Sequence, residues 1–187
     1  MKEKVLYIYG YGSNPNDSFT MKELNKVIDE LGYELISIEY DQINPDNGIN
    51  KLEKYIRNNN IKYVIGHSLG GFITLCINEN VKKIVINPCL KPHFELPKLG
   101  DISTKTLYDY EYLEGWLLLS GNNTPWVSQI EDVIGLFGDH DELIDYYEMF
   151  KKQWPLAYRI NADHRPTKEA YTKDIKKKIK EFFVRTP

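Results

Sequence analysis

Short apolar runs alternate with amphipathic segments along most of this chain, and that alternation limits the fold more than any other feature of the sequence. Runs rich in β-branched and aromatic residues predict strands at residues 5–9, 34–40, 62–66 and 82–88. Helix-period patterns lie between them, at residues 20–31, 50–60 and 70–80. Strands that alternate with helices form a parallel sheet with helices on both faces. We therefore predict an α/β fold with a mostly parallel, doubly wound sheet.

The alternation is interrupted once. Residues 89–128 are irregular and rich in aromatic residues, and regular patterns then return. The later elements are strands at 131–139 and 156–161, and helices at 142–153 and from about residue 167 onward. A chain of 187 residues has the size of one domain, and it contains no internal repeat or linker. We expect a single domain over residues 1–187, with 89–128 as an insertion over one sheet edge and no large cap.

Charge and cysteine usage exclude several classes of function. The net charge is −3, so we expect no basic surface for nucleic acid or anionic membranes. The lysine-rich segment 173–183 is typical of a solvated helix face. Cys76 and Cys89 lack the spacing of a metal site, and no apolar run suits a signal peptide or a membrane span. The sequence therefore predicts a cytoplasmic protein, without metal or cofactor, that acts on a small molecule.

One short motif points to chemistry. Residues 66–70 read G-H-S-L-G, directly after an apolar strand pattern and directly before a helix pattern. This is the arrangement of a nucleophile elbow, in which a serine on a sharp strand-to-helix turn projects its Oγ above the sheet. Glycines two residues away on either side let the strand and the helix lie close together, and the helix N-terminus favours negative charge. We predict that Ser68 is a nucleophile; the alternative is a structural turn.

A serine hydroxyl is a weak nucleophile at neutral pH, so Ser68 needs a base and an acid that orients the base. In this type of fold the acid follows the serine in the chain, and the histidine follows the acid. The loop after residues 131–139 offers four carboxylates, Asp139, Asp141, Glu142 and Asp145. Asp141 lies deeper in the loop than Asp139, and the other two fall in the predicted helix. We predict Asp141 as the acid, with Asp139 as the main alternative.

The chain contains four histidines, and the place of each in the predicted fold indicates whether it can act as the base. His67 precedes the serine at the end of a strand, and we expect it to pack beside the site. His93 lies in the insertion, and His140 is too close along the chain to Asp141 for good geometry. His164 follows the last predicted strand, in the loop A-D-H-R-P. That place suits a general base, so we predict this role for His164; an exposed loop histidine is the alternative.

Attack on a carbonyl also requires hydrogen-bond donors for the negative oxygen that forms. The backbone N–H of Leu69, directly after the nucleophile, is one candidate. The loop Y-G-Y-G-S-N-P follows the first strand, and the N–H of its Tyr11 is the second candidate. The alternative for this loop is a plain turn. It does not match a phosphate-binding loop, because no Gly-Lys-Ser or Gly-Lys-Thr sequence follows.

Three segments give the chain a family resemblance: G-H-S-L-G-G, G-D-H-D-E-L-I-D-Y and A-D-H-R-P match the nucleophile, acid and base positions of α/β-hydrolases. With Y-G-Y-G-S-N-P and N-P-C-L-K-P added, nearly the whole chain resembles the small, capless YqiA-like esterases of the UPF0227 type. The resemblance implies an α/β-hydrolase fold, hydrolysis of carboxylic esters or thioesters, and the same nucleophile, acid and base. The chain departs from the family pattern at Tyr9, where a histidine is usual, and at Arg165 and Pro166.

These patterns predict a cofactor-free serine hydrolase that forms an acyl-enzyme on Ser68. Its predicted partner is a small acyl ester or thioester, and no oligomeric state is predicted. Aromatic residues between positions 105 and 126 are candidates for the wall of an acyl pocket or for the core. Two alternatives use the same fold: a catalytically silent binding protein, and an acyltransferase that passes the acyl group to an acceptor other than water.

Overall fold

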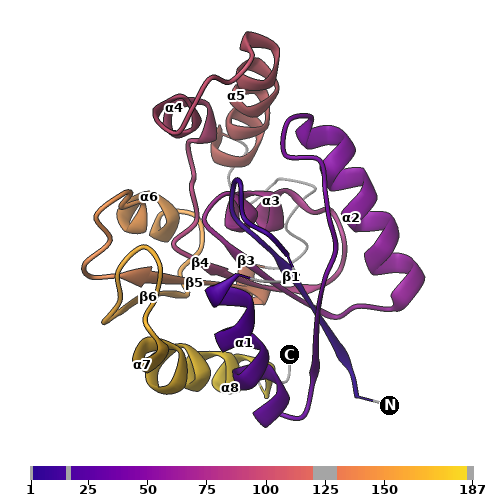
Figure 1. Cartoon of the computed structure of the whole chain (residues 1–187), viewed down its shortest axis with the longest axis vertical. Coiled ribbons are helices and arrows are strands. Elements are labelled where there is room, and N and C mark those ends of the chain that lie inside the picture. Colours follow the sequence, from indigo (N-terminus) through magenta and orange to yellow (C-terminus); the bar gives the residue numbers. More distant parts are fainter. Residues whose placement is uncertain (1, 16–17, 120–129, 185–187) are drawn as a thin grey trace.

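Six parallel strands form the centre of the molecule (Figure 1). The computed structural model describes residues 2–15, 18–119 and 130–184. The strand order is β2-β1-β3-β4-β5-β6, and every neighbouring pair is parallel. The strands are β1 (Lys4–Ile8), β2 (Glu34–Ser37), β3 (Tyr63–His67), β4 (Lys82–Ile86), β5 (Val133–Gly138) and β6 (Ala157–Ile160). The predicted parallel sheet is confirmed, and the carboxyl ends of all its strands lie at one edge.

Helices cover both faces of the sheet, as the alternating pattern predicts. They are α1 (Phe19–Glu30), α2 (Pro45–Asn59), α3 (Leu69–Cys76), α4 (Pro92–Glu95), α5 (Thr104–Leu119), α6 (Tyr147–Lys151), α7 (Lys168–Ala170) and α8 (Lys176–Phe183). In Figure 1, α1, α7 and α8 lie on one side of the sheet, and α2, α3 and α6 lie on the other. The helices α4 and α5 pack against each other, and α5 also contacts α2 and α3.

Local sequence signals account for the ends of α2. The side chain of Asn44 accepts the N–H of Asn47 at 3.1 Å, and Pro45 stands in the first turn, where its missing N–H is not needed. Asn60 caps the C-terminus of the helix and has a left-handed backbone with φ of 51°. Between these ends, an apolar stripe that includes the fully buried Leu52 faces the core. The capping residues and the amphipathic pattern therefore indicate the same helix.

The core consists of the strands and the helix faces that meet them. Side chains of β1, β3, β4 and β5 are almost all buried, on both faces of the sheet. The central strands are therefore mostly apolar runs rather than alternating ones, and the exception is β4, which begins with Lys82 and the buried Lys83. Two buried polar residues, His67 and Asn87, stand at the carboxyl ends of β3 and β4. Buried polar groups require hydrogen-bond partners, so these two residues mark the edge where polar contacts gather.

The segment predicted to be irregular, residues 89–128, is largely helical where the structure describes it. It contains α4, a 3₁₀ turn (Leu96–Lys98) and α5, while residues 120–129 lie outside the described part. In α5, Tyr110 and Leu117 are buried, whereas Tyr108 and Tyr112 are exposed. Because aromatic residues lie on both faces of α5, its sequence lacks a clear helical hydrophobic period and does not predict this helix.

Other boundaries differ from those predicted. The helix expected at 142–153 shortens to α6, because the carboxylates of Asp141 and Asp145 accept the N–H groups of residues that follow them and form turns. The second strand ends at Ser37 rather than at Tyr40, and α3 ends at Cys76. The described residues contain no large cap domain. Every helix in the described ranges falls short of the length and apolar character that a bilayer crossing demands.

Candidate active site

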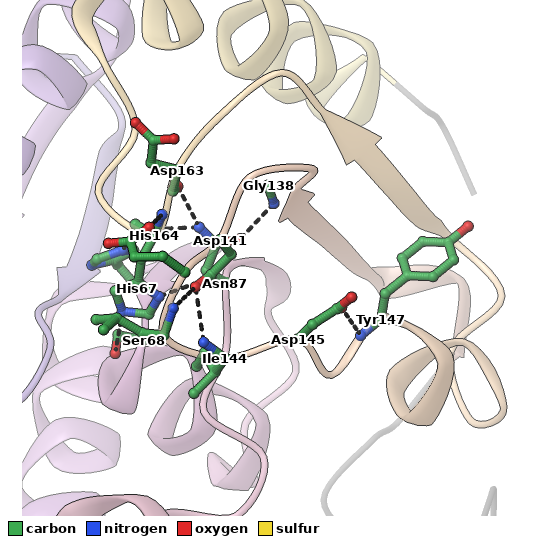
Figure 2. Close-up of polar contacts among 12 residues, drawn as sticks. His67, Ser68, Asn87, Gly138, Asp141, Ile144, Asp145, Tyr147, Asp163 and His164 are labelled. Atoms are coloured by element: carbon green, nitrogen blue, oxygen red, sulfur yellow. Dashed lines mark hydrogen bonds and ion pairs between the residues drawn. The ribbon is translucent and has the colours of Figure 1, made fainter. Parts of the chain in front are cut away.

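Three loops meet at the carboxyl edge of the sheet (Figure 2). Ser68 follows β3, Asp141 lies in the loop after β5, and His164 lies in the loop after β6. The Nε2 atom of His164 is 3.1 Å from Oγ of Ser68, and its Nδ1 atom is 2.8 Å from Oδ2 of Asp141. The structure therefore brings the three residues together in one hydrogen-bonded line.

Ser68 lies on a strained turn between β3 and α3. Its φ of 56° and ψ of −122° fall in a region that residues with a side chain rarely adopt. Glycines on either side make the turn possible. A Cβ at Gly66 would lie 2.2 Å from Oγ1 of Thr74, and a Cβ at Gly70 would lie 2.1 Å from the carbonyl oxygen of Ile8. The prediction that close packing requires glycine at these two positions is confirmed.

The loop that carries Asp141 also orients its carboxylate. The Oδ1 atom accepts the N–H groups of Leu143 and Ile144, each at 2.9 Å, and this leaves Oδ2 for His164. Burial by itself raises the pKa of this carboxyl, but the hydrogen bonds from His164 and from the two amides outweigh burial and lower the pKa below its ordinary value. Asp141 is therefore ionised at neutral pH.

The other three carboxylates of this loop have different partners. Asp145 accepts a hydrogen bond from Nη2 of Arg159 at 2.8 Å, and Asp139 lies 3.9 Å from Nε of the same side chain. Glu142 accepts the backbone N–H of His164 at 3.3 Å. Among these four candidates, the carboxylate that contacts the imidazole of His164 is Asp141.

The remaining histidines have other surroundings. His67 is buried beside the site, with Nε2 at 2.8 Å from the carbonyl oxygen of His164. Burial, together with the nearby imidazole of His164, lowers the pKa of His67 to about 4, so this ring is neutral at pH 7. His93 contacts the buried Glu114 and joins α4 to α5, and His140 is exposed beside the acid loop.

The sequence pattern does not reveal one buried polar residue at the site. Asn87 follows β4 and is 2% exposed, and its Nδ2 atom lies 3.0 Å from the carbonyl oxygens of both Asp163 and His164. Its Oδ1 atom accepts the N–H of Gly138 at 2.7 Å. The signal that marks it is a polar residue between an apolar strand and a proline, at the start of N-P-C-L-K-P.

The loop after β1 passes directly beside the serine. A Cβ at Gly10 would lie 3.2 Å from Cβ of Ser68. Gln42 holds this loop from the other side, because its Nε2 donates to the carbonyl oxygen of Gly10 at 3.0 Å. Tyr11 lies next in this loop and lines the same cavity as Ser68. Leu69, the first residue of α3, also lines this cavity.

A cavity of about 210 Å³ opens beside Ser68 and His164. Much of its wall is apolar and consists of Leu69, Cys89, Leu96, Leu99, Leu143 and Ile144. Glu95 and Lys98 also line it, and their side chains are 2.7 Å apart. An apolar wall with few polar groups is typical of a small-molecule site.

Of the described aromatic residues between positions 105 and 126, none lines this cavity, and only the alternative of a place in the core is met, by Tyr110. Tyr108 and Tyr112 point outward from α5, and Tyr110 lies in the core. Trp126, which falls in the same range of the sequence, lies outside the described residues. Residues 95–99, which precede α5, line the cavity instead, because the insertion passes over the serine before it forms the long helix.

The ranges that the structure describes hold no group of three or more His, Cys, Asp or Glu side chains that could bind a metal ion. Cys76 and Cys89 are free and buried, and burial raises the pKa of both thiols. Both cysteines are therefore protonated, and their packing is that of small apolar residues.

A family model matches nearly the whole sequence, and solved structures share the fold. The model of the uncharacterised protein family UPF0227 matches residues 4–183. No curated protein matches the sequence.

Solved structures with the same architecture come from several organisms. Alpha/beta hydrolase domain-containing protein 10 from mouse has a TM-score of 0.73 at 17% identity, over 96% of this chain and 89% of that chain. The esterase domain of a Rhodothermus marinus protein has a TM-score of 0.70 at 11% identity, over 96% and 85%. Est1E from Butyrivibrio proteoclasticus has a TM-score of 0.68 at 14% identity, over 98% and 89%. These likenesses show the α/β-hydrolase fold.

Proposed function

Because this chain belongs to the uncharacterised protein family UPF0227 and has the α/β-hydrolase fold, we propose that Ser68, His164 and Asp141 form the active site of a serine hydrolase. Its substrates are carboxylic esters or thioesters, which it cleaves through an acyl-enzyme. The observation that carries the proposal is the line of contacts from Ser68 through His164 to Asp141, at 3.1 and 2.8 Å. This line joins the ends of three different strands at a strained turn, which is where reactive groups are typically held.

In the first half of the reaction, Ser68 becomes acylated. Nε2 of His164 takes the proton from Oγ of Ser68 while Oγ attacks the carbonyl carbon of the substrate. The tetrahedral intermediate then collapses, the bond to the alcohol or thiol breaks, and His164 gives the proton to the leaving group. This half yields an ester of Ser68 and a free alcohol or thiol.

In the second half, water cleaves the acyl-enzyme. His164 takes a proton from the water as the water oxygen attacks the acyl carbon, and it returns that proton to Oγ of Ser68 as the carboxylic acid leaves. The ionised Asp141 accepts Nδ1–H of His164 throughout. This contact keeps Nε2 available as the base and stabilises the imidazolium that forms in each half.

The negative oxygen of both intermediates needs donors that are already in place. We assign this role to the N–H groups of Leu69 and Tyr11. The N–H of Leu69 belongs to the first turn of α3, where amides have no partner within the helix and the helix dipole favours negative charge. Tyr11 follows Gly10 in the loop that lies against Ser68. Loss of one such donor typically costs about 3 kcal/mol of transition-state stabilisation.

The cavity limits the size of the acyl group that the site can accept. Its volume of about 210 Å³ and its largely apolar wall suit a compact acyl group better than a long chain. The esterase domain from Rhodothermus marinus among the similar structures supports ester hydrolysis. Esters and thioesters both react through the same acyl-enzyme, so the proposed site serves either class.

Covalent labelling tests the proposed function. A fluorophosphonate probe reacts with an activated serine, so it should label the wild-type protein at about one probe per chain and should not label Ser68→Ala. Ser37→Ala removes a hydroxyl group from β2, away from the site, and should label like the wild type. A folded wild-type protein that does not react would contradict the proposal and favour a binding protein on the same fold.

A further inference from the structure

His164 is held by its backbone carbonyl as well as by its ring. Two buried side chains lie against that carbonyl oxygen, Nε2 of His67 at 2.8 Å and Nδ2 of Asn87 at 3.0 Å. These two residues stand at the ends of the neighbouring strands β3 and β4 and are 6% and 2% exposed. Figure 2 shows both side chains gathered at the loop that carries His164. The reactions proposed above give neither side chain a role.

Asn87 connects the loop of the base to the strand that leads to the acid. Its amide nitrogen donates to the carbonyl oxygens of Asp163 and His164, and its Oδ1 accepts the N–H of Gly138. Gly138 is the last residue of β5, just before the loop of Asp141. The backbone of Asn87 has a φ of 44°, a left-handed value that asparagine tolerates better than most residues. One buried amide therefore links the loop of the base to the end of the strand that leads to the acid.

His67 acts as a donor in this arrangement. A carbonyl oxygen can only accept, so Nε2 of His67 carries a proton. Burial lowers the pKa of His67 to about 4, so the ring holds this proton as a neutral donor near pH 7. His67 directly precedes Ser68, and the strand that presents the nucleophile therefore also holds the backbone of the base.

We infer that Asn87 and His67 are positioning residues, which fix the backbone of His164 so that its ring bridges Ser68 and Asp141. This inference rests on the proposed function. His164 comes from a loop without regular structure, and its two ring contacts of 3.1 and 2.8 Å depend on where that loop sits. A displacement of about 1 Å at a reacting group can lower a rate about 100-fold. Both donors restrain the loop against such a displacement.

Substitutions at His67 distinguish a positioning role of this side chain from a role in packing alone. In His67→Gln, the side-chain amide can still donate to the carbonyl of His164, whereas His67→Leu fills space without a donor. With p-nitrophenyl acetate as substrate, we expect His67→Leu to lower kcat at least about 10-fold while KM stays within about twofold of the wild-type value. His67→Gln should retain at least about a third of the wild-type kcat, because it restores the donor.

Substitutions at Asn87 supply an independent test. Asn87→Gly removes all three hydrogen bonds and suits the left-handed backbone, whereas Asn87→Asp keeps the acceptor for Gly138 and loses both donations. Both variants should lower kcat about 10- to 100-fold. Ile28→Val, a buried change in α1, controls for stability: it should lower the unfolding temperature and keep the wild-type kcat.

Thermal unfolding, measured beside the kinetics, shows whether each variant is folded. If the His67 and Asn87 variants unfold at lower temperature but keep the wild-type kcat, the two side chains are ordinary packing residues and the inference is overturned. If neither Asn87 variant folds, the kcat values of His67→Leu and His67→Gln decide whether the inference holds. A wild-type protein that is inert toward both the ester and a fluorophosphonate contradicts the proposed function itself, so the two failures are distinguishable.

Discussion

Lowering the pH should destabilise this protein through His67. The buried ring has a pKa lowered to about 4 in the folded protein, against 6.5 for an ordinary histidine. Between these values the unfolded chain binds a proton that the folded protein does not, so stability rises with pH in this window. The contribution of His67 to stability is therefore fully present above about pH 6.5, and it is lost as the pH falls toward about 4.

The size of the effect follows from the two pKa values. They differ by about 2.5, which corresponds to about 3–4 kcal/mol because a pKa difference of one is worth about 1.4 kcal/mol. Between pH 7 and pH 4.5, about 2 kcal/mol of this free energy should be lost. A typical domain has a free energy of unfolding of about 5–15 kcal/mol, so a loss of this size is readily measured.

Urea unfolding at pH 7 and at pH 4.5 measures this loss. His67→Gln is the matched variant, because glutamine keeps a donor for the carbonyl of His164 and does not titrate. The drop in unfolding free energy between the two pH values should be about 2 kcal/mol smaller in His67→Gln than in the wild type. Titrating groups remote from His67 are common to both proteins and cancel in this difference. Equal drops would refute the assignment of a buried, neutral His67.

Three further substitutions, one of them paired with a control variant, test the site and its scaffold. Asp141→Asn can still accept the two backbone N–H groups and stay folded, but its NH₂ favours the wrong tautomer of His164, so kcat for ester hydrolysis should fall about 10⁴-fold. Gly70→Ala should unfold the protein or sharply lower its thermal midpoint, because the new Cβ would lie 2.1 Å from a carbonyl oxygen of β1. Gly115→Ala is the control: the new Cβ has open space around it, and the change should stabilise the protein by up to about 1 kcal/mol. Leu96→Ala should enlarge the cavity and shift kcat/KM in a p-nitrophenyl ester series toward longer acyl groups; an unchanged profile would argue that the acyl group lies elsewhere.

The sequence is most informative about residues at the ends of strongly patterned strands. Ser68 could be placed because its glycines and the flanking strand and helix patterns leave few arrangements for the turn. The candidate acid and base follow from chain order, since Asp141 and His164 each come soon after a recognisable strand. Parallel strands then bring these three positions to one edge without any further signal in the sequence.

Features that depend on contacts across the fold could not be predicted in this way. The side chain of Asn87 meets residues 51 to 77 positions away in the chain, and these contacts exist only once β4, β5 and the loop after β6 lie side by side. The helix α5 was hidden because aromatic residues stand on both its buried and its exposed faces. The shortness of α6 comes from the turn at Asp141, where a side chain competes with the helix for backbone N–H groups.

Trapping the acyl-enzyme tests most directly whether Ser68 is the nucleophile. Acid quenching during turnover of p-nitrophenyl acetate, followed by mass measurement of proteolytic peptides, locates any acetyl group that the protein carries. We predict a burst of about one p-nitrophenol per chain and an acetyl group on the peptide that contains Ser68. An acetyl group on a different residue, or turnover without any acylated protein, would contradict the proposed reaction.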